Sequence, residues 1–154
     1  MFDAYRRAAE LLRTLGTKDH GSGANEEEIA GAERAIGVQL PEDYKLFLRD
    51  FGWGGAGHWE LYGLGEDVPS HLDLVDNTHF HRTERQVPVP ATLVPIMDDG
   101  GGNAYCFDTE STKNGRAPIV LWYLELEEDQ VPEDVAPEFA SWFQERVQQV
   151  ADGA

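Results

Sequence analysis

The residues whose spacing comes nearest to a metal site are His79 and His81, with His58 and His71 upstream of them. On an extended strand, side chains two positions apart share a face, so two imidazoles could bind one metal ion together. No carboxylate or thiolate stands at a recognised ligand spacing from this pair. We therefore interpret the pair as solvated loop histidines, and we expect no metal and no other cofactor.

A second candidate for chemistry is the run Asp98-Asp99-Gly100-Gly101-Gly102-Asn103. It has neither the Lys and Ser/Thr of a phosphate-binding loop nor the alternating acids of a calcium loop. Adjacent carboxylates point apart on extended backbone, which makes them a poor acid/base pair. The run is typical of a hairpin turn between two strands.

Cys106 is the only cysteine, so no internal disulfide can form. It lies within an apolar run, where a cysteine usually behaves as a small hydrophobic residue and not as a nucleophile. The sequence also contains no Gly-x-Ser-x-Gly elbow, His-Glu-x-x-His pair or dinucleotide-binding fingerprint. We expect the protein not to be an enzyme and predict no catalytic residue. A small metal-dependent hydrolase that uses the histidines or Asp98 and Asp99 is the minority alternative.

The charge of the chain restricts its partners. Its 154 residues contain 29 Asp and Glu against 12 Lys and Arg, a formal net charge of −17. Such a charge repels phosphate backbones and anionic lipid surfaces, so we expect neither direct nucleic-acid binding nor membrane binding. The start of the sequence has no signal-peptide pattern and no run is long enough to span a membrane, so we expect a cytoplasmic protein.

The excess of acids over bases is greatest in residues 124–154, which contain nine acids and the single base Arg146. A solvated face and a site for a basic partner are both compatible with this cluster. Trp53 and Trp59 flank a glycine-rich segment, 54–58, that we expect to be a mobile loop, and such aromatic residues are either interface anchors or core residues. The predicted partner-binding residues are Trp53, Asp98, Asp99, Glu125, Glu127, Glu128 and Asp129.

The first part of the chain is expected to form three helices. Apolar residues recur at three- and four-residue steps over 2–15, which predicts a helix ended by Gly16. Asn25, followed by three glutamates, predicts the start of a second helix that ends at Gly37. Pro41 at a first helical position predicts a third, which ends at Gly52.

The rest of the chain contains most of the strand signals. Residues 59–62 predict a short strand, and 70–85 have a weakly helical spacing. Residues 93–97, 104–108 and 118–124 are the clearest strands and predict an antiparallel meander. A last helix from Pro137 should pack on one side of this sheet. The expected fold class is α+β, with N-terminal helices, a mainly antiparallel sheet and a C-terminal helix.

The order of short motifs between residues 26 and 64 resembles the SUKH superfamily of Smi/Knr-type domains. The most specific element is Gly37-Val38-Gln39-Leu40-Pro41-Glu42-Asp43-Tyr44, and the similarity continues through 93–96, 98–103, 105–108, 118–120 and 139–143. The resemblance implies one domain over 1–154, with its core motifs in 25–147 and an N-terminal helix and loop in 1–24. The family-motif residues, all with a structural explanation, are Gly37, Leu40, Pro41, Tyr44, Phe47, Leu48, Tyr62 and Gly63.

The same resemblance implies a function in protein binding. Many members of the superfamily are bacterial immunity proteins that neutralise polymorphic or contact-dependent toxins, often nucleases, and others are cell-wall regulators. The expected partner is therefore a cognate toxin with a basic surface, which an acidic inhibitor would complement. A regulatory scaffold that binds endogenous proteins is the alternative. The N-terminal helix and residues 71–82 depart from the family pattern, so partner choice could lie there; the oligomeric state is not predicted.

Overall fold

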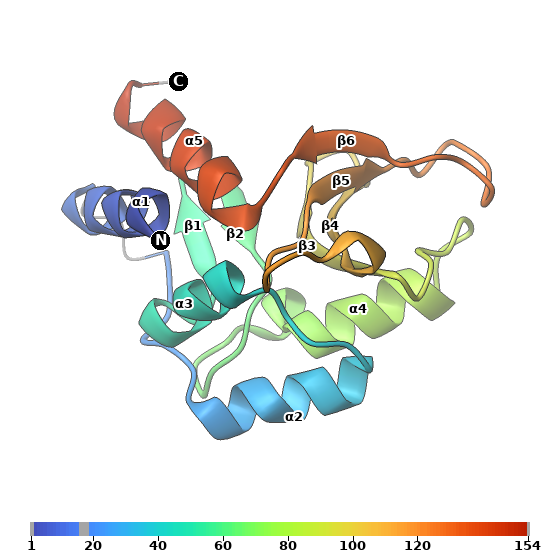
Figure 1. Cartoon of the computed structure of the whole chain (residues 1–154), viewed down its shortest axis with the longest axis horizontal. Coiled ribbons are helices and arrows are strands. Elements are labelled where there is room, and N and C mark those ends of the chain that lie inside the picture. Colours follow the sequence, from blue (N-terminus) through green and yellow to red (C-terminus); the bar gives the residue numbers. More distant parts are fainter. Residues whose placement is uncertain (1, 16–18, 154) are drawn as a thin grey trace.

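The helices of the N-terminal third form largely where the sequence predicts them (Figure 1). The computed structural model describes residues 2–15 and 19–153. Helix α2 begins with the predicted capping box: the Asn25 side chain accepts from the Glu28 amide at 2.8 Å, and the Glu28 side chain accepts from the Asn25 amide at 3.0 Å. Gly37 ends the helix in the left-handed region, at φ 87°. Pro41 precedes α3 as its cap instead of occupying its first turn, and the predicted stop at Gly16 lies outside the described residues.

Three helices come first along the chain, the strands follow with α4 between β2 and β3, and a helix comes last. The elements are α1 (Asp3–Thr14), α2 (Glu26–Ile36), α3 (Glu42–Asp50), β1 (Gly54–Ala56), β2 (Trp59–Leu61), the short 3-10 helix η1 (Ser70–Leu72), α4 (Leu74–Thr83), β3 (Leu93–Asp98), β4 (Ala104–Asp108), η2 (Thr109–Ser111), β5 (Ile119–Trp122), β6 (Glu133–Ala136) and α5 (Phe139–Ala151). This arrangement confirms the predicted α+β class.

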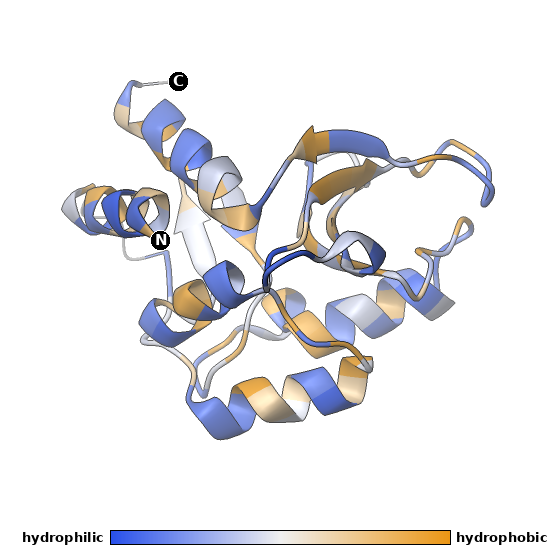
Figure 2. Cartoon of the chain, viewed as in Figure 1, coloured by the Kyte–Doolittle hydropathy of each residue, from blue (hydrophilic) through white to orange (hydrophobic). Residues whose placement is uncertain are grey.

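The main sheet is an antiparallel meander in the order β3-β4-β5-β6. The three predicted strands pair as expected, with Val94 opposite Phe107 and Cys106 opposite Val120. The edge strand β6 was not predicted, because its first two residues are acids and it lacks an apolar alternation. Figure 2 shows this contrast between the hydrophobic β5 and the largely hydrophilic start of β6.

A second, two-stranded sheet pairs β1 with β2. The prediction of a mobile loop at 54–58 was therefore wrong: residues 54–56 are a buried strand. Glycine is required at the second position of this strand, because a Cβ on Gly55 would lie 2.4 Å from the ring of Trp59. The indole thus covers the glycine strand, and Trp59 is a core residue with 5% of its surface exposed.

Aromatic residues from α3, α5 and the sheet meet in the main core. Tyr44 contacts Phe107 edge-on at 5.0 Å between ring centroids, and Phe139 stacks on Phe143 at 5.2 Å. Helix α5 lies against α1, where Tyr5 stacks on Phe143, and it reaches the sheet through Phe139. The predicted contact between the last helix and the sheet is confirmed, but α5 also packs against the N-terminal helix.

Candidate partner-binding site

The turn between β3 and β4 is shaped by its own acids. Asp98 Oδ1 accepts from the amides of Gly100 at 2.6 Å and Gly102 at 3.3 Å, and Asp99 Oδ1 accepts from the amide of Gly101 at 2.7 Å. Partial burial raises the pKa of Asp99, but hydrogen bonds from the Asn103 side chain and nearby amides outweigh it, so that the pKa is lowered. The predicted hairpin turn is confirmed, and its two acids are exposed.

Residues 124–131, which we call the acidic loop, connect β5 to β6. The side chain of Gln130 closes this loop: its Oε1 accepts from the Tyr123 amide at 3.0 Å, and its Nε2 donates to the carbonyls of Tyr123 at 2.9 Å and Glu127 at 3.0 Å. Because Gln130, near the end of the loop, binds the backbone of Tyr123, just before its start, the two ends are held together and the loop has a defined shape. Sequence reasoning missed Gln130, since nothing in its neighbourhood marks it as a clamp.

The β3–β4 turn and the acidic loop lie side by side. Asn103 Oδ1 accepts from the Leu124 amide at 2.8 Å, and Arg85, after α4, donates to the Gly102 carbonyl. The Trp122 indole also donates to the Val87 carbonyl at 3.2 Å, which holds the chain after α4 against β5. In Figure 1 the acidic loop and the chain after α4 project from the same end of the molecule. The two segments that contain six of the seven predicted partner-binding residues are thus in contact.

The acidic loop presents both charge and apolar surface. All four of its carboxylates are exposed, and none forms an ion pair with any cation in 2–15 or 19–153; they belong to Glu125, Glu127, Glu128 and Asp129. Among them lie Leu126, 49% exposed, and Val131, 88% exposed. Exposed apolar side chains within a polar rim are typical of protein interaction sites.

Trp53, the seventh predicted residue, lies elsewhere. Its indole nitrogen donates to Asp67 Oδ1 at 3.0 Å, and its ring covers Gly21, where a Cβ would lie 2.2 Å from that nitrogen. Hydrogen bonds from Trp53 and Ser22 lower the pKa of Asp67. Trp53 therefore joins the segments on either side of β1 and β2, and its place in an interface stays a prediction.

His79 and His81 form no shared site. They lie on helix α4, where residues two apart point in different directions, so the strand arrangement that a metal site would need is not present. His81 is not a solvated loop residue as predicted: it is 3% exposed, and its ring contacts the Tyr62 hydroxyl at 3.3 Å and Arg85 at 2.8 Å. Burial, with the charge of Arg85, lowers its pKa to about 4, whereas His79 is exposed. Among the described residues, no group of three or more His, Cys, Asp and Glu could hold a metal ion.

The remaining reactive groups are part of the packing. Cys106 is fully buried on β4, and burial raises the pKa of its thiol. Tyr44 of the family motif donates to the Tyr62 carbonyl at 2.7 Å. A Cβ on Gly63 would lie 1.7 Å from the Gly52 carbonyl oxygen, so only glycine fits there. These contacts place Tyr44, Tyr62 and Gly63 in the packing of the fold.

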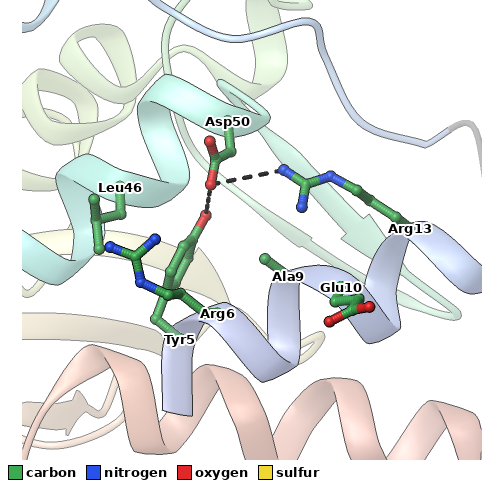
Figure 3. A pocket seen from close by; sticks show the side chains of 7 residues that line it. All are labelled: Tyr5, Arg6, Ala9, Glu10, Arg13, Leu46 and Asp50. Carbon is green, nitrogen blue, oxygen red and sulfur yellow. Dashed lines mark hydrogen bonds and ion pairs between the residues drawn. The ribbon is translucent and has the colours of Figure 1, made fainter. Parts of the chain in front are cut away.

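A hollow of about 510 Å³ lies between α1 and α3 (Figure 3). Its polar groups bind one another: the Tyr5 hydroxyl donates to Asp50 at 2.7 Å, and Arg13 lies 3.7 Å from the same carboxylate oxygen. Burial and the hydrogen bond to Asp50 raise the pKa of Tyr5. We interpret this network as the attachment of α1 to α3, separate from the acidic loop.

Comparison with known proteins agrees with the fold and the motif order. A family model described as SMI1-KNR4 cell-wall (SUKH_5) matches residues 6–148. The SPbeta prophage-derived protein YokK of Bacillus subtilis (strain 168) is 28% identical over 131 residues, covering 65% of this chain and 62% of that protein. The chain therefore spans less than two thirds of the length of this curated relative.

A crystal structure of a protein from Pseudomonas syringae pv. tomato has the same fold, with a TM-score of 0.62 and 21% identity over 80% of this chain and 87% of that one. None of the described helices has the length and apolar character needed to cross a bilayer. The resemblance predicted from the motifs is confirmed, because the family model extends from α1 into α5. The chain belongs to the SUKH family of SMI1-KNR4 cell-wall proteins.

Proposed function

We propose that this protein is an immunity protein that binds the toxic domain of a cognate bacterial toxin and blocks it stoichiometrically, without catalysis of its own. The observation that carries the proposal is the acidic loop, in which exposed Leu126 lies among four exposed carboxylates that form no ion pair within the described residues. Family membership supports a role in protein binding. On this proposal the protein acts in the cytoplasm, where its partner would meet nucleic acid.

The loop suits capture of a basic surface for two physical reasons. Like charges held together on one loop raise the local potential, which speeds the encounter with an opposite charge and makes it dependent on salt. The apolar side chains of Leu126 and Val131 can then be buried, and burial of a whole aliphatic side chain contributes about 1.5–3 kcal/mol. A nuclease has a basic groove for its substrate, and a protein of charge −17 would compete for that groove.

Co-expression tests the proposal directly. A toxin gene next to the gene for this chain is expressed with it, and rescue of growth and co-purification of the two proteins are measured. We expect both with the native chain and neither when Glu125, Glu127, Glu128 and Asp129 are all reversed to Lys. Association should slow, and the dependence of its rate on salt should weaken.

The matched control reverses four exposed acids that are spread over the surface, namely Glu10, Glu27, Glu66 and Glu145. Both variants change the net charge equally, so the control should still rescue growth and keep most of its association rate. Equal loss in the two variants would show that total charge, not the acidic loop, matters. No rescue and no complex with the native chain would reject the immunity function.

The second candidate is a regulatory scaffold that binds an endogenous protein, and the family's cell-wall description favours it. The two functions differ in when the protein is needed. Deletion of the gene in a strain that lacks the toxin should have no effect on growth if the protein is an immunity protein. A cell-wall defect in that strain would favour the regulatory function.

A further inference from the structure

A second hollow, of about 480 Å³, lies beside the acidic loop and extends to α4. Phe80 of α4 and Leu124 at the start of the acidic loop supply its apolar lining, and Asp98 of the β3–β4 turn supplies a carboxylate. Phe80 is 50% exposed, although it meets the ring of His81 edge-on at 5.7 Å. An aromatic ring that is half open to solvent, next to a carboxylate, is available to a ligand.

The polar groups of this hollow divide into donors already in use and acceptors still available. Arg85 donates to His81 at 2.8 Å and also to the Gly102 carbonyl. The side-chain nitrogen of Asn77 donates to the carbonyls of His71 at 3.0 Å and Asp73 at 2.8 Å, which leaves its oxygen to accept. In Asp98 it is Oδ1 that accepts from the turn amides, and no group in 2–15 or 19–153 donates to Oδ2, so this oxygen is available as well.

We propose that this hollow takes an arginine side chain of the partner protein. A guanidinium is flat, carries a full positive charge and has five N–H donors, so it can stack on an aromatic face while it donates to several acceptors. The hollow is lined by the half-exposed ring of Phe80 and by Asp98 and Asn77, whose Oδ2 and Oδ1 accept no hydrogen bond from the described residues. The inference rests on the proposed function, because it names the anchor by which a basic partner would bind at the same end of the molecule.

Arginine fits this hollow better than the other side chains of a basic surface. A lysine ammonium is compact and strongly hydrated, and it has no flat face to lay on a ring. An apolar anchor would bury the oxygens of Asp98 and Asn77 without donors, which is costly. The charge of Arg85 opposes a cation, but the carboxylates of Asp98 and the neighbouring acidic loop outnumber it.

Two capped tripeptides, one with a central arginine and one with a central lysine, test this inference by NMR titration of the isotope-labelled protein. The two probes carry the same charge, so general attraction to the acids affects them equally. We expect the arginine probe to shift the amide signals of Gly102 and His81 and to bind about three- to fivefold more tightly, which corresponds to a cation–π gain of about 0.5–1 kcal/mol.

Phe80→Ala should abolish the preference for arginine, whereas Val135→Ala, which truncates an exposed apolar side chain on β6 outside the acidic loop, should keep it. Asp98→Asn retains an oxygen for the turn amides and should weaken the binding of the arginine probe. Equal binding of the two probes, signal shifts elsewhere on the surface, or an unchanged preference in Phe80→Ala would overturn the inference.

The outcome is independent of the test of the proposed function. If the arginine preference is present but the acidic-loop reversal leaves toxin binding unchanged, the hollow is a site and the proposed interface is wrong. If toxin binding is lost on reversal but the probes bind equally, the acidic loop is the interface and the arginine anchor is wrong.

Discussion

At the scale of single residues, Asp43 explains why an acid belongs in the most specific family motif. Its side chain is fully buried and accepts from the amides of Tyr44 and Ala140, each at 3.0 Å. Ala140 is in the first turn of α5, whose own cap residue, Glu138, provides no side-chain cap. Asp43 therefore accepts a hydrogen bond from an otherwise unpaired amide at the start of a helix that lies 97 positions further along the chain. Burial nevertheless raises the pKa of Asp43, despite these hydrogen bonds.

His81 gives the protein a defined response to acid. Its pKa is lowered from 6.5 to about 4 by burial and by Arg85, so between these values the unfolded chain binds a proton that the folded protein does not. Stability must therefore fall as the pH decreases from 6.5 to about 4, by about 2–3 kcal/mol for this group. We expect His81→Gln to lack this part of the pH dependence, as measured by urea unfolding at a series of pH values.

The exposed His79 provides the control for this prediction. His79→Gln should keep the full pH dependence, because the ring is outside the core. Parallel curves for the native protein and His81→Gln over the same range of pH would contradict the assignment.

At the scale of elements, the predictable parts of the fold are those whose signals are local. The start and end of α2 depend on Asn25, Glu28 and Gly37, all within or next to the helix, and they were predicted correctly. β1 and β6 depend on distant partners: β1 is covered by Trp59, and β6 pairs with β5 through a shifted register around Val135. Neither strand has the alternation that marks a strand in isolation, and Val135 is the single β-branched residue in the two.

The candidate site divides in the same way. Its acids could be found by counting charges along the sequence, and the hairpin at Asp98 and Asp99 follows from its glycines. The contact of Asn103 with Leu124 and the clamp made by Gln130 could not be found, because each joins residues that no sequence periodicity links. Phe80 was missed as an exposed aromatic residue, since burial depends on how α4 packs against α2 and β3.

Gly63 packs closely against the backbone of Gly52, so the stability of the protein should be sensitive to a side chain at position 63. A Cβ on Gly63 would meet the Gly52 carbonyl oxygen at 1.7 Å, and backbone cannot move aside as a flexible side chain can. Gly63→Ala should therefore lower the free energy of unfolding by about 3 kcal/mol or more, at the upper end of the range for overpacking. Urea denaturation measures this change.

Gly101→Ala is the matched control, because a Cβ there meets only a carboxylate oxygen of Asp99, at 3.5 Å. Its cost should stay within about 0.5 kcal/mol, as for most surface substitutions. A similar loss in both variants would show that the cost comes from the flexibility of glycine and not from the close contact.

At the scale of the whole molecule, the charges are unevenly placed. Ion pairs occur mainly among the helices, as between Arg49 and Glu26 or Lys45 and Glu33, whereas the acidic loop has no basic residue within it. At a net charge of −17 the carboxylates of the folded protein repel one another, and this repulsion is strongest where acids lie together without cations. The surface that we propose for binding is thus also a source of instability in the free protein.

Salt should therefore stabilise the free protein. Raising NaCl from about 0.02 to 0.2 M shortens the screening length from roughly 20 Å to below 10 Å, and we expect the free energy of unfolding to increase by about 1 kcal/mol. Urea is the suitable denaturant, because guanidinium chloride would itself screen the charges. A decrease with salt would instead mean that the ion pairs among the helices outweigh the repulsion.

The effect of clustered charge on stability can be distinguished from that of total charge with two variants, each of which replaces four acids by neutral residues. The first changes Glu125, Glu127 and Glu128 to Gln and Asp129 to Asn, and the second changes Glu10, Glu27, Glu66 and Glu145 to Gln. Since repulsion falls with distance, the first should be more stable than the native protein at low salt, by about 0.5 kcal/mol, and should gain less from added NaCl than the second. Equal behaviour of the two variants would mean that the acidic loop carries no concentrated field, which would remove the electrostatic reason for placing the partner there.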